Sequence, residues 1–242
     1  THRKNRYSDQ AFYFISVDNG VGKRISSASV VETDATDQIS SYKDFVFYEK
    51  DLTNLFGSGQ QWFGDSFKIK NTRNYSIDFQ NLDTSSEVLF RVRAVAESSS
   101  TSSMNVQIDG LSSFDINFNL INNGSYVRAS AASKEFSANL IDGDIDLTIS
   151  YNNNGNPSAN AHLDYIEVIG DKLLIASGNQ FSFRNYLSQT SGKVLEYEIA
   201  NVENIDRVWD VTDFLNPKKI PNQSDSEVGF RFKTNSGLLN EY

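Results

Sequence analysis

The chain has 242 residues, which is enough for one large β domain or two smaller ones. Its composition is 38% hydrophobic and 12% aromatic, which excludes a disordered chain, and its formal net charge of −9 argues against binding to nucleic acid or to anionic lipid through a basic patch. Cysteine is absent, so the chain has no disulfides and no thiol chemistry of its own.

No run of residues approaches the roughly 20 apolar residues that a membrane-spanning helix needs. The sequence starts THRKNRYSDQ, without Met and without the pattern of a signal peptide. We therefore expect either a processed protein or part of a longer one.

The first predicted element is a hairpin over 11–25, in which AFYFISV and GKRI flank the turn signal Asp18-Asn19-Gly20. The segment 42–48 predicts a strand, although its two faces differ little in polarity. A short helical turn is expected around 49–56, ended by Gly57-Ser58-Gly59.

From residue 74 onward, apolar side chains recur at every second position, which is typical of antiparallel strands with one buried face. In EVLFRVRAVAE (87–97), for example, the apolar positions alternate with Arg91 and Arg93. The segments with this pattern are 74–80, 87–97, 103–110, 113–120, 126–140 (weaker), 144–153 and 162–170, and the Asn-rich stretch 152–160 is a loop. The fold class predicted for 37–170 is an all-β jelly-roll β-sandwich.

After Gly170 further strand-like segments follow, namely DKLLIAS, QFSFRNYL, KVLEYEIANV, RVWDVTD and PNQSDSEVGFRFKTN. They exceed what one jelly roll needs, so 171–242 is predicted to be a second, smaller β unit. The N-terminal hairpin, within 1–36, is expected to pack with this second unit. No helix of normal length is expected anywhere.

The sequence contains few residues that could form a catalytic site. A Ser/His/Asp site would have to use His2, at the terminus, or His162, which is interpreted as a surface or loop-packing histidine. No GxSxG motif and no phosphate-binding loop occurs, and carboxylate pairs are too numerous to indicate a glycosidase. We predict no catalytic, cofactor-binding or metal-binding residue, and a freestanding hydrolase is disfavoured because it would lack a base.

The best candidate for calcium is the acidic stretch Asp142, Asp144 and Asp146, because calcium prefers carboxylate oxygens. The spacing fails that of an EF-hand, with Asn153 at the position of the bidentate Glu. Since these acids alternate with apolar residues, the solvated face of a strand is the favoured interpretation. A structural calcium between loops stays open.

Aromatic residues gather in QQWFGDSF, which holds Trp62, Phe63 and Phe67. Exposed aromatic rings stack on sugars in carbohydrate-binding modules, whereas a core tryptophan would anchor the start of a strand. The core interpretation is favoured for Trp62, and Trp209 is likewise expected to pack in the core.

Two resemblances add to these patterns. HLDYIEV (162–168), which follows the Asn-rich loop, resembles the last strand of galactose-binding-like jelly rolls, a fold that includes carbohydrate-binding modules. Five segments in order also resemble the PorU family, the gingipain-like cysteine peptidases and sortases of the type IX secretion system of Bacteroidetes. They are RYSDQAFYFISVDNGVGKRI (6–25), SYKDFVFYEKDLTNLFGSGQQWFGDSF (41–67), HLDYIEV, QFSFRN (180–185) and VWDVTDFLNP (208–217).

The PorU resemblance implies an N-terminal, noncatalytic fragment. In that family a segment similar to 208–217 lies just before the peptidase domain, although Phe214 stands where Pro is common, and Trp209 would anchor this joint. The Cys/His dyad of the family has no counterpart here, so no catalytic residue is carried over.

The same resemblance implies a location at the cell surface, associated with the outer membrane, in a protein that removes the secretion signal of exported cargo and attaches the cargo to lipopolysaccharide. The implied partners are the protein's own C-terminal peptidase domain, secreted cargo or other subunits of the attachment complex, and the lipopolysaccharide glycan. The alternative is a carbohydrate-binding module in which Trp62 and the loops at 152–161 meet a surface glycan.

Overall fold

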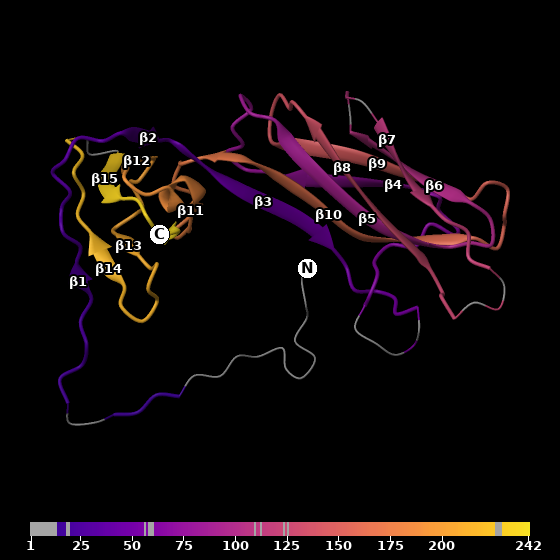
Figure 1. The fold of residues 1–242 in the computed structure, drawn as a ribbon, viewed down its shortest axis with the longest axis horizontal. Coiled ribbons are helices and arrows are strands. Elements are labelled where there is room, and N and C mark those ends of the chain that lie inside the picture. The colour runs from indigo at the N-terminus through magenta and orange to yellow at the C-terminus, as the bar shows by residue number, and fades with distance from the viewer. Residues whose placement is uncertain are drawn as a thin grey trace.

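We describe residues 14–17, 20–55, 57, 61–108, 110–111, 113–122, 124, 126–225 and 229–242 of a computed structural model of the chain. The predicted all-β class is confirmed: two β units lie next to each other along the long axis of the molecule, a sandwich and a smaller unit (Figure 1). In the described part of the chain, no helix is long and apolar enough to cross a bilayer.

The larger unit is a sandwich of two four-stranded antiparallel sheets, with strand orders β3-β10-β5-β8 and β4-β9-β6-β7. Its strands are β3 (Ser41–Glu49), β4 (Thr72–Asp78), β5 (Val88–Glu97), β6 (Ser102–Ile108), β7 (Ser113–Phe118), β8 (Ser130–Ala138), β9 (Asp144–Asn152) and β10 (Asn160–Leu173). This is the β-sandwich that the period of two predicts for this part of the chain.

The core of the sandwich consists of the side chains that the alternation assigned to the inner face. They include Val88, Phe90, Val92 and Ala94 of β5, Met104, Val106 and Ile108 of β6, and Ile145, Leu147 and Ile149 of β9. Two glycines permit close packing at one end of this core. A Cβ on Gly143 would lie 2.3 Å from the Phe79 carbonyl oxygen, and one on Gly170 would lie 2.8 Å from Leu82 Cδ1. A larger residue at Gly143 would displace the Phe79 backbone, and one at Gly170 would displace the Leu82 side chain.

The smaller unit is assembled from short strands that are distant in sequence. Its sheets have the orders β15-β12-β2, β1-β14-β13 and β11-β16. The elements are β1 (Ser26–Ser27), β2 (Asp37–Ile39), β11 (Arg184–Asn185), the 3-10 helix η1 (Tyr186–Gln189), β12 (Val194–Ala200), β13 (Val208–Asp210), β14 (Lys218–Ile220), β15 (Gly229–Asn235) and β16 (Asn240–Glu241).

Aromatic rings fill the core of the smaller unit. The ring centroids of Tyr197 and Phe232 lie 4.9 Å apart, as do those of Phe232 and Tyr242, and Phe183 lies 5.1 Å from Tyr242. Rings at these separations add stacking and edge contacts to the burial of apolar area. A unit with few long strands gains much of its core from such rings.

The chain passes between the two units at two places that lie side by side, as Figure 1 shows. β2 lies in the smaller unit and is separated from β3 of the sandwich by Ser40 alone. At the same place β10 leaves the sandwich, and the Leu174 N–H donates to the Ser40 carbonyl oxygen at 2.7 Å. Tyr42 of β3 packs its ring 5.5 Å from that of Phe183. This connection does not test the domain limits 1–36, 37–170 and 171–242, which remain predictions.

The structure differs from the expected N-terminal hairpin. Residues 14–17 and 20–25 form no strand, and the side chains of Phe14, Ile15 and Val17 are more than nine-tenths exposed. The rest of the expected hairpin, 11–13 and 18–19, lies outside the described residues. β1 begins only at Ser26, where it pairs in parallel with β14. An isolated two-stranded hairpin is only marginally stable in water. A turn signal between two strand-like segments is therefore weak evidence for a hairpin unless another element packs against it.

The expected helical turn at 49–56 is wrong for the residues described there. β3 extends to Glu49, and the Leu52 and Thr53 N–H groups both donate to the Phe63 carbonyl oxygen, at 3.0 and 2.9 Å. These bonds across the loop replace those that a helical turn would make. Phe56 lies outside the described residues.

The structure also differs from the sequence prediction at two strands of the smaller unit. DKLLIAS does not start a new strand, because β10 continues without a break to Leu173. QFSFRNYL is a strand only at Arg184–Asn185, after which η1 begins with Asn185 as its cap, its side-chain oxygen accepting from the Leu187 N–H. An Asn cap favours helical turns over extended backbone.

Candidate ligand-binding site

The segment 61–67 lies against the first part of β10. The Gly64 N–H donates to the Leu163 carbonyl oxygen at 2.7 Å, and the Phe67 N–H donates to the Ala161 carbonyl oxygen at 2.8 Å. β3 pairs only with the later part of β10, from Tyr165 onward, beyond a register shift after Leu163. The segment therefore hydrogen-bonds to the part of the β10 edge that lies beyond the end of β3.

Gly64 favours this close approach. A Cβ at this position would lie 3.0 Å from the Lys50 carbonyl oxygen and 3.3 Å from the Leu163 carbonyl oxygen. Both neighbours are backbone atoms, which cannot rotate out of the way as a flexible side chain does. Because it has no Cβ, Gly64 lets the segment pass close to both of these backbone carbonyl groups.

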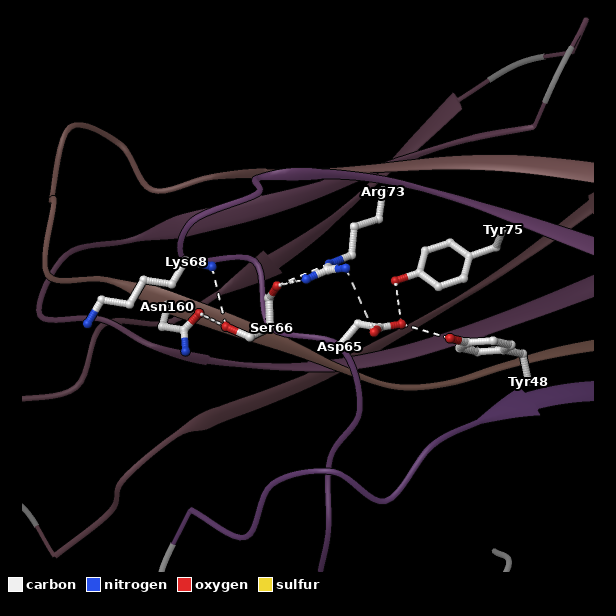
Figure 2. A network of polar contacts seen from close by, with 7 residues as sticks. All are labelled: Tyr48, Asp65, Ser66, Lys68, Arg73, Tyr75 and Asn160. Carbon is white, nitrogen blue, oxygen red and sulfur yellow. Dashed lines mark hydrogen bonds and ion pairs between the residues drawn. The ribbon is translucent and has the colours of Figure 1, made fainter.

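Asp65 fastens the segment to the sandwich (Figure 2). Its Oδ2 accepts hydrogen bonds from the Tyr48 hydroxyl at 2.8 Å and from the Tyr75 hydroxyl at 3.3 Å, and its Oδ1 lies 3.8 Å from an Arg73 guanidinium nitrogen. Tyr48 comes from β3, whereas Arg73 and Tyr75 come from β4. One carboxylate therefore links the edges of both sheets.

Burial raises the pKa of the Tyr75 phenol, and the nearby Asp65 carboxylate acts in the same direction. Burial also raises the pKa of Tyr48. Both phenols accordingly keep their protons at neutral pH and act as hydrogen-bond donors. The cluster therefore has the bonding pattern of a structural clamp.

A second set of bonds holds the next residue. Arg73 donates from Nε and Nη2 to the Ser66 carbonyl oxygen, at 3.1 and 2.7 Å, and Ser66 Oγ donates to Asn160 Oδ1 at 2.9 Å. Asn160 Nδ2 lies 2.8 Å from His162 Nε2, while Glu97 Oε1 lies 3.6 Å from the same nitrogen. The Ser66 hydroxyl is therefore directed at Asn160, and Asn160 lies between it and His162 in this chain of contacts.

His162 is only 3% exposed. It pairs with Ser66 in an isolated β-bridge, so the segment covers it. The expected packing against a loop is therefore seen, whereas a surface position is wrong. His2 lies outside the described residues, and the absence of catalytic residues stays a prediction.

A pocket of about 470 Å³ opens beside the clamp, where the segment turns into β4. It lies at the start of β10, and thus at the end of the sandwich away from the smaller unit (Figure 1). The lining residues are Phe67, Lys68, Ile69, Asn71, Tyr151, Asn152, Asn153 and Ala159. Its volume falls within the range of small-molecule sites.

This pocket is held in place by backbone bonds between its two walls. The Tyr151 N–H donates to the Asn71 carbonyl oxygen at 2.7 Å, which continues the pairing of β4 with β9. Phe67 is one of the lining residues, is 1% exposed, and has the Arg73 guanidinium carbon 5.7 Å from its ring centroid. The clamp that anchors Asp65 therefore also fixes the pocket.

Sequence reasoning included the Asn-rich loop but missed Lys68, Ile69 and Asn71. Their signal was available as the basic stretch FKIKNTR (67–73) in an acidic chain. Nothing in the sequence alone says that this stretch meets a loop about 80 residues later, because only the pairing of β4 with β9 brings the two together.

The tryptophans do not lie where the sequence predicted. Trp62 is 46% exposed and Trp209 is 40% exposed, so the core positions expected for them are wrong. Their neighbours Phe63, at 3%, and Val208, at 7%, are the buried residues. Trp62 is not among the residues that line the pocket. At both places the residue next to the tryptophan, and not the tryptophan itself, is the one that packs in the core.

The acidic stretch lies on a solvated strand face, as favoured from the sequence. Asp144 and Asp146 are exposed on β9, and Asp146 Oδ1 accepts a hydrogen bond from Ser76. Asp142 accepts from the Asp144 N–H in the preceding turn. Within the described residues, no group of three or more His, Cys, Asp or Glu side chains is placed to hold a metal ion.

The fold and this site define an all-β protein with a jelly-roll sandwich, a second β unit and a polar pocket. Among solved structures, the chain is similar to dimeric latent PorU from Porphyromonas gingivalis, with a TM-score of 0.74 and 20% sequence identity. The match covers 90% of this chain and 21% of the PorU chain, so the chain spans about a fifth of that protein. At this identity the similarity shows a PorU-like fold.

Weaker likenesses are limited to part of the chain. The CBM36-1 domain of a multidomain xylanase, from the hindgut metagenome of Trinervitermes trinervoides, gives a TM-score of 0.35 at 14% identity, covering 52% of this chain and 95% of that one. CBM35 from Cellvibrio japonicus Abf62 gives 0.34 at 13% identity, covering 60% and 94%. No protein-family model matches the sequence, and no curated protein sequence matches it.

Proposed function

We propose that this chain is the noncatalytic N-terminal β region of a PorU-like sortase of the type IX secretion system. The observation that carries the proposal is the similarity to PorU over 90% of the chain, which extends through both β units. A jelly roll alone hosts many functions, whereas a sandwich joined to a second β unit in this way is a more specific architecture.

The segments that resemble the PorU family support the same proposal. Three of them contain β3, β11 and β13, and HLDYIEV (162–168) lies within β10. The segment 41–67 also contains Asp65 of the clamp. The first segment lies partly outside the described residues. These segments therefore coincide with strands that build and join the two units.

In this role the chain is a platform and carries out no chemistry. Its partners are the peptidase domain of the same protein, secreted cargo or other subunits of the attachment complex, at the outer-membrane surface. Signal removal and transfer of the cargo to lipopolysaccharide proceed in the peptidase domain through a cysteine acyl-enzyme. Purified chain should cleave no peptide, and cleavage that persists with cysteine-peptidase inhibitors would contradict the noncatalytic role.

The platform role is tested in cells of the source organism by deleting the coding sequence of these residues. We expect exported cargo to accumulate with its C-terminal signal uncleaved and to be lost from the surface. Normal processing and attachment in the deletion strain would contradict the proposal. Expression of the full gene from a plasmid is the control for secondary effects.

A carbohydrate-binding module is the second candidate, and the polar pocket at 67–71 and 151–159 favours it. The site differs from the one expected, because Trp62 is not in the pocket. Titration with surface polysaccharide followed by tryptophan fluorescence separates the two sites. A saturable change that Trp62→Ala abolishes would place the glycan at Trp62 and not in the pocket.

A further inference from the structure

The loops at one end of the sandwich form one connected surface. By the register of the strands, four connections lie at the end where β10 begins, away from the smaller unit (Figure 1). We call their described residues the distal loops, which fall in 50–71, 98–101, 119–129 and 153–159. The Ile121 N–H donates to the Ser98 carbonyl oxygen at 2.8 Å. Asn156 Nδ2 donates to Ser99 Oγ at 3.2 Å, so three of these loops are bonded to one another, and the first loop meets the last at the pocket.

The distal loops are basic, although the whole chain carries a net charge of −9. Their exposed cations are Lys50, Lys68, Lys70 and Arg128. Their carboxylates are Asp51 and Asp65, and Asp65 is already bonded within the clamp. The described residues of the loops at the opposite end of the sandwich include three carboxylates and no lysine or arginine. Those loops are 79–87, 110–111 and 139–143, and the carboxylates are Asp83, Glu87 and Asp142. The acidic charge that argued against an anionic partner therefore lies elsewhere on the molecule.

Large apolar side chains are exposed on the same basic surface. Ile69 and Tyr126 are fully exposed. About half of the surface of Leu52, Trp62 and Leu120 is exposed as well. Exposed apolar side chains that gather in one region mark a site of contact with another protein or with a membrane. The distal loops therefore combine positive charge with apolar surface.

An anionic lipid bilayer provides both environments that these side chains need. Its headgroup phosphates attract Lys and Arg, and the boundary of the acyl chains accepts apolar side chains. Trp and Tyr are enriched at that depth, where one part of the ring is apolar and the other can form hydrogen bonds. A nucleic acid or an acidic protein would pair with Lys68 and Lys70 but leave Ile69 beside charged groups. An apolar patch on a protein would leave the two lysines without counter-charges.

We propose that the distal loops dock this chain on the surface of an anionic lipid bilayer. Lys68, Lys70 and Arg128 lie at the phosphates, and Ile69 and Tyr126 enter the headgroup region. The smaller unit then faces away from the bilayer, because it lies at the other end of the sandwich (Figure 1). The inference needs no peptidase domain and is independent of the platform role.

Sedimentation of the whole chain with vesicles measures the binding. The vesicles contain phosphatidylcholine alone or equal parts of phosphatidylcholine and phosphatidylglycerol. We expect binding to the mixed vesicles and at least about tenfold weaker binding to phosphatidylcholine alone. Binding should also weaken at about 1 M salt, where the Debye length falls to about 3 Å. Soluble poly-glutamate offers negative charge without an apolar phase and should bind more weakly than the mixed vesicles.

A pair of lysine variants tests where the positive charge acts. Removal of both Lys68 and Lys70 by alanine should weaken binding to the mixed vesicles about tenfold or more, because each cation near an anionic surface contributes to the attraction. Lys218→Ala with Lys219→Ala is the matched control. It removes two exposed lysines from β14 of the smaller unit, changes the net charge equally and should bind as the parent does.

A pair of isoleucine variants tests the apolar contact. Ile69→Ser should weaken binding to the mixed vesicles about fivefold or more, since its side chain no longer gains from leaving water. Ile141→Ser is the control, because Ile141 is 93% exposed but lies in a loop of the opposite end. Thermal unfolding confirms that each variant is folded.

The two tryptophans of the chain report which end of the molecule meets the bilayer. Trp62 belongs to the distal loops, whereas Trp209 belongs to β13 of the smaller unit. Trp209→Phe leaves Trp62 as the fluorophore, and Trp62→Phe leaves Trp209. We expect mixed vesicles with brominated acyl chains to quench Trp62 and to leave the emission of Trp209 unchanged.

Several results would overturn the inference. They are no binding to the mixed vesicles, equal binding to both kinds of vesicle, tighter binding of poly-glutamate, parent-like binding by the folded variant that lacks Lys68 and Lys70, and quenching of Trp209 in place of Trp62. Tighter binding of poly-glutamate would assign the distal loops to an acidic protein. If the lysine variant fails to fold, Ile69→Ser and the two quenching measurements still decide the outcome.

Discussion

The Tyr48 hydroxyl donates a hydrogen bond of 2.8 Å to Asp65 Oδ2, and this bond ties β3 to the segment that takes over the edge of β10. The same oxygen accepts from Tyr75 of β4, at 3.3 Å. Both phenols have raised pKa values because of their burial. The carboxylate thus connects the two sheets to the segment 61–67, whose last residue, Phe67, lines the pocket.

Removal of this acceptor should destabilise the chain. Asp65→Ala leaves two partly buried phenols and Arg73 without their shared partner, and we expect a loss of about 2–3 kcal/mol in the free energy of unfolding. Urea denaturation followed by circular dichroism measures it. Asp51→Ala removes an exposed carboxylate nearby and should change stability by about 0.5 kcal/mol or less. Equal effects of the two variants would contradict the role of the clamp.

The tyrosines buried in the core of the smaller unit, to which Tyr42 of β3 contributes, should make the chain sensitive to alkali. Burial raises the pKa of Tyr197 from its ordinary value of 10.0 to about 12, and that of Tyr42 likewise to about 12. A raised pKa in the folded state means that the unfolded chain loses the proton first. The stabilisation is thus complete below pH 10 and is lost as pH rises through about 12.

Tyr197→Phe should reduce this alkaline loss, because one of the buried phenols is then absent. The measurement is the free energy of unfolding against pH, together with the absorbance of tyrosinate. Tyr186→Phe is the control, since the Tyr186 ring is 57% exposed. An identical pH dependence of the free energy of unfolding in the parent and in Tyr197→Phe would show that the pKa of Tyr197 is not raised in the folded state.

Trp62 and Phe63 should differ sharply in their contribution to stability. Phe63 is 3% exposed, so Phe63→Ala should cost about 3–5 kcal/mol. Trp62 is 46% exposed, and Trp62→Ala should cost about 1 kcal/mol or less. Urea denaturation of both variants gives the comparison. The reverse order would restore the core position that the sequence favoured for Trp62.

Gly143→Ala should be destabilising by about 1–3 kcal/mol, because the new Cβ would lie 2.3 Å from a backbone carbonyl oxygen and must displace it. The variant Ile141→Ala changes a side chain in the same turn that is 93% exposed, and should be nearly neutral. The thermal midpoints of both variants check this. An unchanged thermal midpoint in Gly143→Ala would contradict this prediction, because it would mean that the Phe79 backbone can shift to accommodate the new Cβ.

The sandwich was largely predictable because its strands are long and each has one buried face. In β5 four apolar side chains alternate with arginines, and all four are buried in the structure. The smaller unit was predicted only in outline. β1 and β2 have two and three residues and pair in parallel with β14 and β12, far along the chain, so local periodicity carries no sign of them.

The site was less predictable than the fold. The exposure of Trp62 and Trp209 depends on which face the neighbouring strands cover, and that is a tertiary property. The pocket needs Lys68 and Asn153 on the same side of a strand pairing that no local signal specifies. What sequence reasoning did provide was the jelly roll and the Asn-rich loop, and the segments that resemble the PorU family stay a resemblance beside the PorU-like fold.

The most direct measurement is an immunoblot of fractionated source cells, using an antibody raised against this chain. A PorU-like sortase should give a band several times larger than 27.2 kDa, in the outer-membrane fraction and accessible to protease added to intact cells. A single band at 27.2 kDa would contradict the proposal that these residues are the platform of a larger enzyme.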